Sequence, residues 1–110
     1  MKAIWNGKVI AKSSDVEEIE GNYYFPIESI KKQYFIDSKT QSTCPWKGKA
    51  SYFNIIVDGE INEDAAWYYP TPNQYAIILK DRIAFWKGVE IRESSSLIRF
   101  ELLNVLNTLF

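Results

Sequence analysis

The stretch "ASYFNIIVDGEINEDAAWYY", residues 50–69, decides the fold because it encodes two β-strands around a tight turn. Apolar side chains at every second position share one face of the first predicted strand: Phe53, Ile55 and Val57. Asp58 and Gly59 tolerate the positive φ angles of a type I′ turn, which returns the chain as a β-hairpin. Residues 63–66 are poor strand formers, so they predict a bulge or one helical turn in the second strand.

The same hairpin carries a second, aromatic set of side chains. Tyr52 alternates away from the aliphatic face, and Trp67 lies on the opposite arm, close enough to share a sheet face with it. Tyr69 lies on the same side of its strand as Trp67. The pattern therefore predicts a sheet with one aliphatic core face, and with either a pocket or a second core on its Tyr/Trp face.

Working outward, turn dipeptides predict further hairpins at Asn6-Gly7 and Gly21-Asn22 and a turn at Lys87-Gly88. Pro26 is expected to end a strand, because proline cannot donate to a sheet ladder. Helical spacing of apolar side chains in residues 27–35 predicts a short helix of about two turns.

The remaining segments are assigned by composition. Residues 37–43, "DSKTQST", are predicted to form a polar loop, and residues 70–74 form a second loop around two prolines. Residues 75–79 and 82–86 are apolar and are predicted to be strands.

The last segment, residues 94–110, differs in character from the rest. Apolar side chains recur there at helical spacing, at Ile98, Leu102, Val105 and Leu109. This predicts a C-terminal amphipathic helix that packs on the domain of residues 1–93 or forms a homodimer contact. The expected fold is mainly β (α+β): an antiparallel, hairpin-rich sheet or barrel-like domain with one short internal helix and this terminal helix.

Composition narrows the classes of function. Thirteen basic against fourteen acidic residues give a net charge of −1, so no nucleic-acid partner is expected. The absence of histidine and the single cysteine argue against an imidazole- or cysteine-based metal site, and neither metal nor cofactor is predicted. No apolar run is long enough for a signal peptide or a membrane span, so we expect a cytoplasmic protein with no membrane partner.

The stretch "TCPWKG", residues 43–48, predicts a three-residue hairpin loop. Pro45 fits the second position of a type I turn, and Gly48 fits a left-handed bulge. This loop places Cys44 and Lys47 at its two ends. Two interpretations are open for them: a small apolar residue and a solvated lysine, or a thiol whose pKa a neighbouring cation lowers.

These motifs, taken in order, resemble a known family. The run "YFP", Ser38, "TCPWKGKASY", "AAWYYPTP" and "IAFW" is similar to domain-of-unknown-function family 427, also labelled a nucleotidyltransferase-like domain, over about residues 1–91. The resemblance implies a compact, mainly β single domain. The matching positions are Tyr24, Pro26, Ser38, Cys44, Lys47, Gly48, Tyr52, Trp67, Tyr69, Pro70 and Phe85.

Two features separate the chain from what the family's label implies. Many relatives carry histidine where this chain has Thr43. Nucleotidyl transfer also needs paired carboxylates for Mg²⁺ and a glycine-rich phosphate loop, and the sequence has no Asp-x-Asp pair and no such loop.

The residues are most consistent with a small-molecule binding domain. Its aromatic pocket would lie behind the TCPWKG loop, with Lys47 holding an anionic group. The predicted ligand-binding residues are Ser38, Lys47, Tyr52, Trp67 and Tyr69, with Cys44 at the rim. The alternatives are an enzyme that uses Cys44 and Lys47 for thiol chemistry or group transfer, and a protein-interaction module that uses the C-terminal helix.

Overall fold

A computed structural model describes residues 1–93 of the chain, so the predicted C-terminal helix lies outside the described residues. The strands are β1 (Lys2–Trp5), β2 (Lys8–Lys12), β3 (Glu17–Ile19), β4 (Asn22–Pro26), β5 (Phe35–Cys44), β6 (Gly48–Val57), β7 (Glu60–Tyr68), β8 (Arg82–Phe85) and β9 (Glu90–Arg92). Three short 3₁₀ segments are η1 (Ile27–Ser29), η2 (Lys32–Tyr34) and η3 (Gln74–Leu79). None of the helices in residues 1–93 has the length and apolar character that crossing a bilayer requires.

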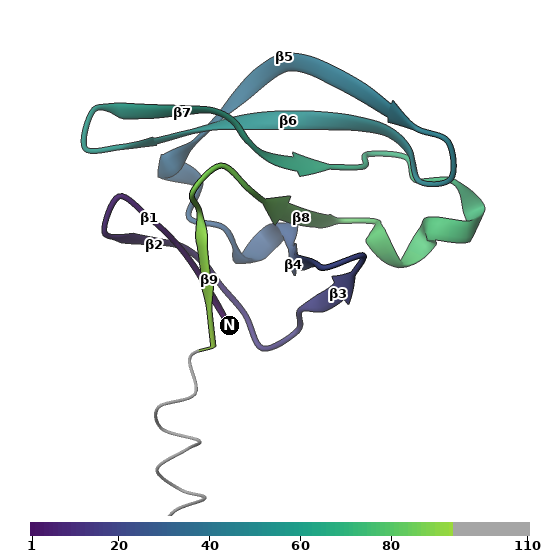
Figure 1. Cartoon of the computed structure of the whole chain (residues 1–110), viewed down its shortest axis with the longest axis horizontal. Helices are drawn as coiled ribbons and strands as arrows, with labels where there is room; N and C mark the ends of the chain where they lie inside the picture. Colours follow the sequence, from purple (N-terminus) through teal and green to yellow (C-terminus); the bar gives the residue numbers. More distant parts are fainter. Residues whose placement is uncertain (94–110) are drawn as a thin grey trace, which may run out of the picture.

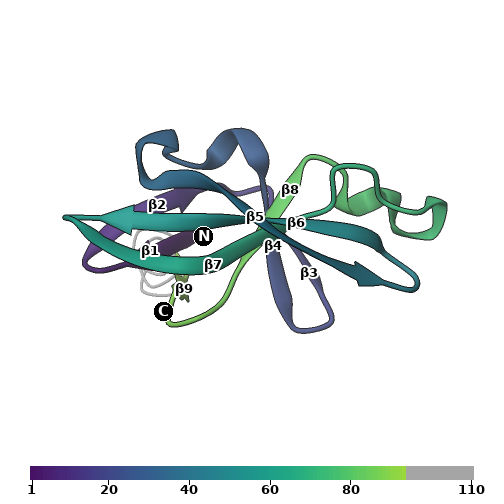
Figure 2. The same ribbon diagram turned by 90° about the horizontal axis from the view of Figure 1, so that it is seen from above.

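The strands form two antiparallel sheets (Figure 1). The larger sheet has the order β3-β4-β8-β7-β6-β5, and the smaller sheet has the order β2-β1-β9. Figure 2 shows the long ribbon of β5, β6 and β7 from above, extending past the shorter strands at both ends. The prediction of a mainly β, hairpin-rich fold is confirmed.

Turn chemistry explains most of these connections. Asn6 and Gly7 have φ angles of 49° and 77° between β1 and β2, and Asp58-Gly59 has nearly the same geometry between β6 and β7. Both predicted turns are therefore confirmed. The β3–β4 turn is at Glu20-Gly21, one residue earlier than predicted, which makes Asn22 the first residue of β4.

The predicted irregularity in β7 is a bulge. Phe53 of β6 pairs with Ala66, whereas Ile55, two residues further on, pairs with Asn62. The extra residues of β7 include Asp64, whose φ of 54° lies in the left-handed region. The backbone N–H of Asp64 donates to Asn54 Oδ1 at 2.8 Å, so a side chain satisfies this bulged peptide.

The prediction of a polar loop at residues 37–43 is wrong, because these residues belong to β5. β5 is an edge strand, and its backbone pairs with β6 on one side only. Most of its side chains are exposed, so Ser, Thr, Lys and Gln there meet solvent at no desolvation cost. Polar composition reflects the edge position of this strand.

Residues 75–79 form the 3₁₀ segment η3, so the predicted strand there is also wrong. Ala76 and Leu79 are three residues apart and are buried, while Tyr75, Ile77 and Ile78 are exposed. Ala76 has a non-helical backbone (φ −122°, ψ 25°), so the segment consists of two short turns with a kink between them, and Ala76 and Leu79 are its buried residues. The apolar run suggested a strand because only one side of this segment meets the core.

The single helix predicted in residues 27–35 is likewise replaced by two separate 3₁₀ turns, η1 and η2. Ile30 lies between them with an extended backbone and forms a β-bridge with Ala11. A tertiary hydrogen-bonding partner therefore overrides the helical spacing at this point.

The large sheet separates two clusters of buried side chains. The first cluster joins the two sheets and consists of Ala3, Ile10, Ala11, Phe25, Ile55, Val57, Ala65, Ala66, Ile83 and Phe85. The second cluster consists of Tyr24, Ala50, Tyr69, Ala76, Leu79 and Ala84. Neighbouring residues of one strand, such as Tyr24 and Phe25, enter different clusters, as alternation requires. One face of the sheet therefore carries aliphatic and phenylalanine side chains, and the other, called the aromatic face below, carries Tyr24, Tyr69 and Trp67.

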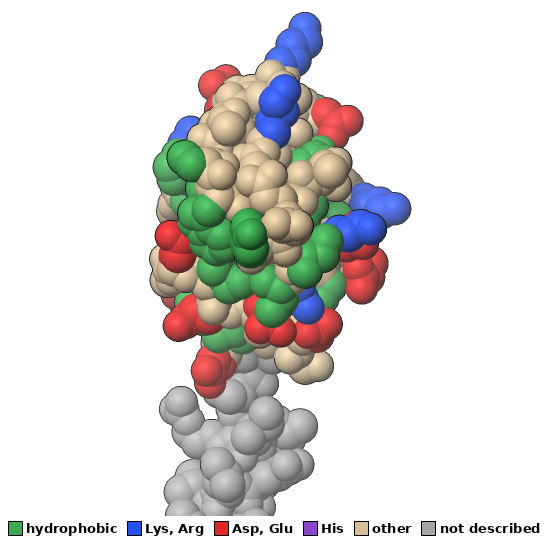
Figure 3. Space-filling model, turned by 90° about the vertical axis from the view of Figure 1, so that its right-hand side faces the viewer, with side chains coloured by type: hydrophobic (Ala, Val, Ile, Leu, Met, Phe, Trp, Pro, Cys, Tyr) green, Lys and Arg blue, Asp and Glu red, His purple; other side chains and the backbone are tan. Residues whose placement is uncertain are grey.

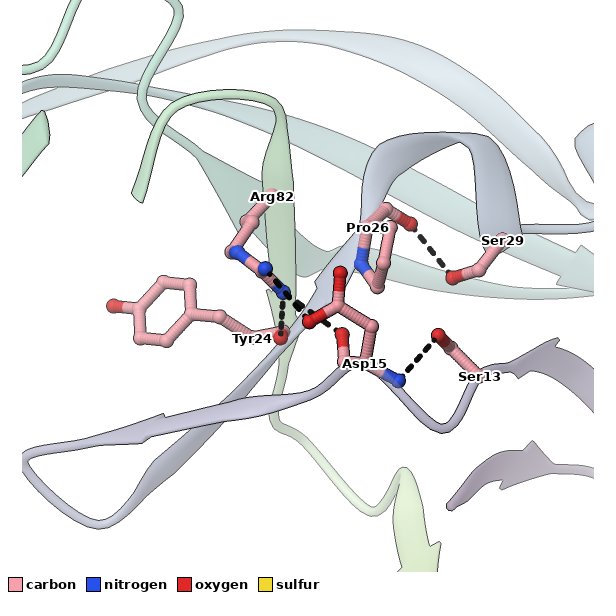
Figure 4. A network of polar contacts seen from close by, with 6 residues as sticks. All are labelled: Ser13, Asp15, Tyr24, Pro26, Ser29 and Arg82. Atoms are coloured by element: carbon pink, nitrogen blue, oxygen red, sulfur yellow. Dashed lines mark hydrogen bonds and ion pairs between the residues drawn. The ribbon is translucent and has the colours of Figure 1, made fainter. Parts of the chain in front are cut away.

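Arg82 fastens the chain before β3 to this sheet (Figure 4). Its guanidinium donates to the backbone oxygens of Asp15 at 2.8 Å and Tyr24 at 3.3 Å, and pairs with the Asp15 carboxylate at 3.0 Å. The fork geometry of arginine allows one side chain to satisfy all three acceptors. This contact fixes β4, from which Tyr24 enters the aromatic face.

Candidate functional site

A cavity of about 320 Å³ lies on the aromatic face of the large sheet. Its lining consists of Asn22, Lys47, Tyr52, Trp67, Tyr69 and Trp86. These residues come from β4, the β5–β6 loop, β6, the end of β7 and the residue after β8. Four of the predicted ligand-binding residues are thus brought together, although they come from separate segments of the chain: Lys47, Tyr52, Trp67 and Tyr69.

The rings of the cavity hold one another in place. Tyr52 and Trp67 are directly opposite each other in the β6–β7 ladder. Trp67 packs edge-to-face against Trp86, with ring centroids 5.8 Å apart, and against buried Tyr24 at 6.2 Å. Its indole N–H donates to the Tyr24 hydroxyl at 3.3 Å. Trp67 is therefore oriented by contacts on two sides before any ligand arrives.

Trp86 owes its position to the bulge in β7. Its indole N–H donates to the carbonyl of Asp64, and its backbone N–H donates to the carbonyl of Ala65 at 3.0 Å. Both acceptors belong to the bulged segment, where the ladder to β6 is interrupted. The bulge thus supplies the acceptor that holds the Trp86 ring beside Trp67.

Lys47 is the buried charge of the site, at 9% exposure. Its ammonium contacts the Glu20 carboxylate at 2.5 Å and lies 5.2 Å from the Trp46 ring and 6.0 Å from the Tyr69 ring. Burial is the largest single influence on its pKa and lowers it. The hydrogen bond to Glu20 and the nearby tyrosines outweigh that effect, so the pKa of Lys47 is raised. Lys47 is therefore a cation at neutral pH.

The loop that presents Lys47 has the predicted form: Cys44 pairs with Gly48 across three loop residues. Asn73 braces it, because its backbone N–H donates to the Lys47 carbonyl at 2.9 Å and its amide donates to the Pro45 carbonyl at 3.3 Å. Gly48 has a φ of 112°, and a Cβ there would lie 3.3 Å from the carbonyl oxygen of Thr71. Glycine is thus required both by the backbone angle and by the close approach of the next loop.

Two buried tyrosines supply neutral hydroxyls near the ammonium. Burial raises the pKa of Tyr69 to about 12, and burial also raises the pKa of Tyr24, although Trp67 and Lys47 oppose the shift at Tyr24. Both side chains are protonated phenols across the physiological pH range. They can donate hydrogen bonds but carry no charge that would neutralise Lys47.

Ser38 lies outside the cavity lining. Its hydroxyl donates to Asp64 Oδ1 at 2.5 Å, and Thr40 donates to Asp64 Oδ2 at 2.8 Å. These bonds, first that of Ser38, lower the pKa of Asp64. Ser38 therefore links β5 to the bulge of β7, and the expectation that it joins the other pocket residues is not met.

Cys44 also lies outside the cavity lining. It is half-buried and packs against the second cluster, to which Tyr69 belongs. The ammonium of Lys47 is engaged by Glu20 at the far end of the loop. Cys44 is thus a partly buried residue at the margin of the second cluster, and both interpretations of its sequence context stay open.

Three residues of the site were not identified from the sequence: Glu20, Asn22 and Trp86. Glu20 and Asn22 flank Gly21 in the β3–β4 turn, and such polar turn residues are common everywhere. Trp86 comes directly before the Lys87-Gly88 turn and appeared as the last residue of a strand. Only the pairing of strands from distant parts of the chain brings the three to Lys47.

Residues 1–93 bring together no cluster of three or more acidic or cysteine side chains suited to a metal ion. The model of the family described as "Domain of unknown function (DUF427)" matches residues 1–95. The chain therefore belongs to this family. The comparison with curated proteins gave no match. Because the family description names no activity, the function is argued from the cavity.

Proposed function

We propose that this domain binds a small molecule in the cavity lined by Tyr52, Trp67, Tyr69 and Trp86, with Lys47 as the anchor for an anionic group. The observation that carries the proposal is the buried cation at the edge of a cavity whose other walls are mostly aromatic. Small-molecule sites combine this kind of apolar lining with a few polar groups that fix orientation, and about 320 Å³ is at the lower end of their usual size.

The aromatic lining supports a planar or apolar ligand body. Trp67 and Trp86 form two walls at a steep angle, 77° between their planes, and Tyr52 lies beside Trp67 as its cross-strand neighbour. A ring bound there would meet one indole face-on and the other edge-on, the two arrangements that aromatic quadrupoles favour. Each such contact is worth about 0.5–1.5 kcal/mol beyond the area that it buries.

The polar groups support an anionic substituent. Lys47 is charged, and its burial weakens the solvent screening of any ligand charge placed beside it. Asn22 and the hydroxyl of Tyr52 add donors at other points of the lining. Tyr52 already exchanges a hydrogen bond of 2.8 Å with Ser42, so its hydroxyl is oriented.

A thermal-shift screen of aromatic carboxylates, aromatic phosphates and their neutral analogues tests the proposal. We expect hits that raise the melting temperature of the wild type, with the shift lost in Lys47→Met and reduced in Trp67→Phe. Lys49→Met is the matched control, because Lys49 is exposed on the same hairpin and outside this cavity. If Lys47→Met binds every hit as well as the Lys49→Met control does, the cavity is not the binding site.

A further inference from the structure

The ammonium of Lys47 already has an anionic partner, the side chain of Glu20. Glu20 occupies the first position of the β3–β4 turn, with a φ of 54°, and its Oε1 accepts from Lys47 Nζ at 2.5 Å. The two partners differ in burial: the side chain of Lys47 is 11% exposed, whereas that of Glu20 is 52% exposed. Lys47 is thus fixed in the wall of the cavity, while Glu20 reaches it from solvent.

Another anion can readily replace the Glu20 carboxylate on Lys47. A released Glu20 carboxylate would be rehydrated, because its side chain is 52% exposed. The ammonium of Lys47 would instead remain largely buried near the rings of Trp46 and Tyr69. An unpaired ammonium is less stable there than a paired one, so this position favours an anionic partner.

Resting on the proposed function, we infer that Glu20 is a resident competitor and that the ligand is an aromatic monocarboxylate whose carboxylate replaces that of Glu20 on Lys47. Glu20 shows which group the position accepts: a planar, singly charged carboxylate held by one ammonium. Glu20 therefore acts as a specificity-determining residue. A ligand displaces it only if the ligand offers Lys47 a comparable carboxylate and also makes contacts with the rings that Glu20 does not make.

The charge of the lining favours a monoanion over a phosphate. Of the residues that line the cavity, Lys47 is the one cationic side chain. Asn22 and the phenols offer neutral donors, which suit the second oxygen of a carboxylate. A phosphate dianion would leave one charge uncompensated in a partly desolvated site, because phosphate sites use several cations or a run of backbone N–H groups.

Removal of the competitor tests this inference. The probes are 2-naphthoate, 2-naphthyl phosphate and the neutral 2-naphthalenemethanol, and binding is followed by the fluorescence of the tryptophans around the cavity. We expect Glu20→Gln to bind 2-naphthoate at least about fivefold more tightly than the wild type, because the competing carboxylate is gone and even an exposed ion pair accounts for about that factor. The affinity for the neutral alcohol should not change.

Glu18→Gln is the matched control, because it removes the same charge from the same hairpin, whereas Glu18 pairs with Tyr23 in the β3–β4 ladder and is not the carboxylate paired with Lys47. Circular dichroism and the melting temperature establish that each variant is folded. Acylation of Lys47 by an amine-reactive reagent, located by peptide mapping, gives a readout without ligand and should be faster in Glu20→Gln than in Glu18→Gln.

The outcomes separate the two proposals. Equal 2-naphthoate affinity in wild type, Glu20→Gln and Glu18→Gln would overturn the role of Glu20 and leave the binding site standing. Tighter binding of the phosphate than of the carboxylate would overturn the monocarboxylate class. If no probe binds any variant, both this inference and the proposed function are overturned.

Discussion

One face of the six-stranded sheet packs against the sheet of β1, β2 and β9, while the other is covered by η3 and the loop of residues 69–73. The first face carries aliphatic and phenylalanine side chains that pack together. The ring centroids of Phe25 and Phe85, for example, are 5.5 Å apart. On the second face Leu79 and Tyr69 are buried, whereas Tyr52 and Trp67 are only half-buried.

The difference shows how one sheet can hold both a core and a site. A sheet covering another sheet excludes water along its length, which stabilises the fold through burial. A single 3₁₀ segment covers less, and the uncovered Tyr and Trp side chains tolerate water at their polar atoms. The end of the molecule formed by the β5–β6 loop and η3 also carries exposed apolar side chains, among them that of Trp46. Figure 3 shows hydrophobic groups gathered at this end.

The largest expected effect on stability lies on the closed face, the one that packs against the sheet of β1, β2 and β9. The other, partly covered face is the open face. Phe25→Ala should reduce the free energy of unfolding by about 3–5 kcal/mol, because Phe25 is fully buried and its removal leaves a cavity. Trp67→Phe on the open face should cost only about 1 kcal/mol, mainly the lost hydrogen bond to Tyr24. Urea unfolding measures both. Equal losses would mean that the two faces are packed alike.

A second prediction uses alkaline pH to probe the open face. Tyr69 ionises at about 12 in the folded chain but at its ordinary value of 10.0 in the unfolded chain. The contribution of neutral Tyr69 to the free energy of unfolding is therefore complete below pH 10 and is lost as the pH rises to 12, amounting to about 2.7 kcal/mol. The free energy of unfolding, measured from pH 10 to pH 12, should fall less steeply for Tyr69→Phe than for the wild type. An identical decline in the variant would place Tyr69 in solvent.

A third prediction concerns the glycine that ends the loop bearing Lys47. Gly7→Ala imposes a φ of 77° on alanine, at about 1 kcal/mol, whereas Gly48→Ala imposes 112°, which lies further from the left-handed region and costs more. Only at Gly48 does the added Cβ approach a neighbour, the Thr71 carbonyl at 3.3 Å. We expect Gly48→Ala to cost about 1 kcal/mol more by urea unfolding and to weaken ligand binding. Equal losses of stability in Gly7→Ala and Gly48→Ala would show that the loop containing Thr71 moves away from the added Cβ.

The smallest effect is expected at Cys44. If the half-buried side chain of Cys44 serves only as a small apolar residue against the second cluster, Cys44→Ala should cost about 1 kcal/mol or less. Ligand affinity, measured by fluorescence titration, should change less than twofold. A complete loss of ligand binding in this variant would instead support the alternative in which the Cys44 thiol takes part in the chemistry of the site.

How much of this could be read from the sequence depends on the range of the interactions involved. Alternation in residues 50–57 correctly assigned side chains to two faces, and the hairpin loop before Gly48 was correct in length. By contrast, β5 and η3 were misassigned, since an edge position and a one-sided contact with the core are set by neighbours distant in sequence.

The sequence alone determined the turns at Asn6-Gly7 and Asp58-Gly59, the two-faced sheet and three of the rings, because positive φ angles and the two-residue period of strands are local steric properties. Only the tertiary structure decided that Glu20 meets Lys47, that Trp86 closes the cavity and that Ser38 lies outside it. Those contacts join separate strands through the bulge at Asp64 and the β3–β4 turn, and strand order and register are fixed by the packing of the whole sheet.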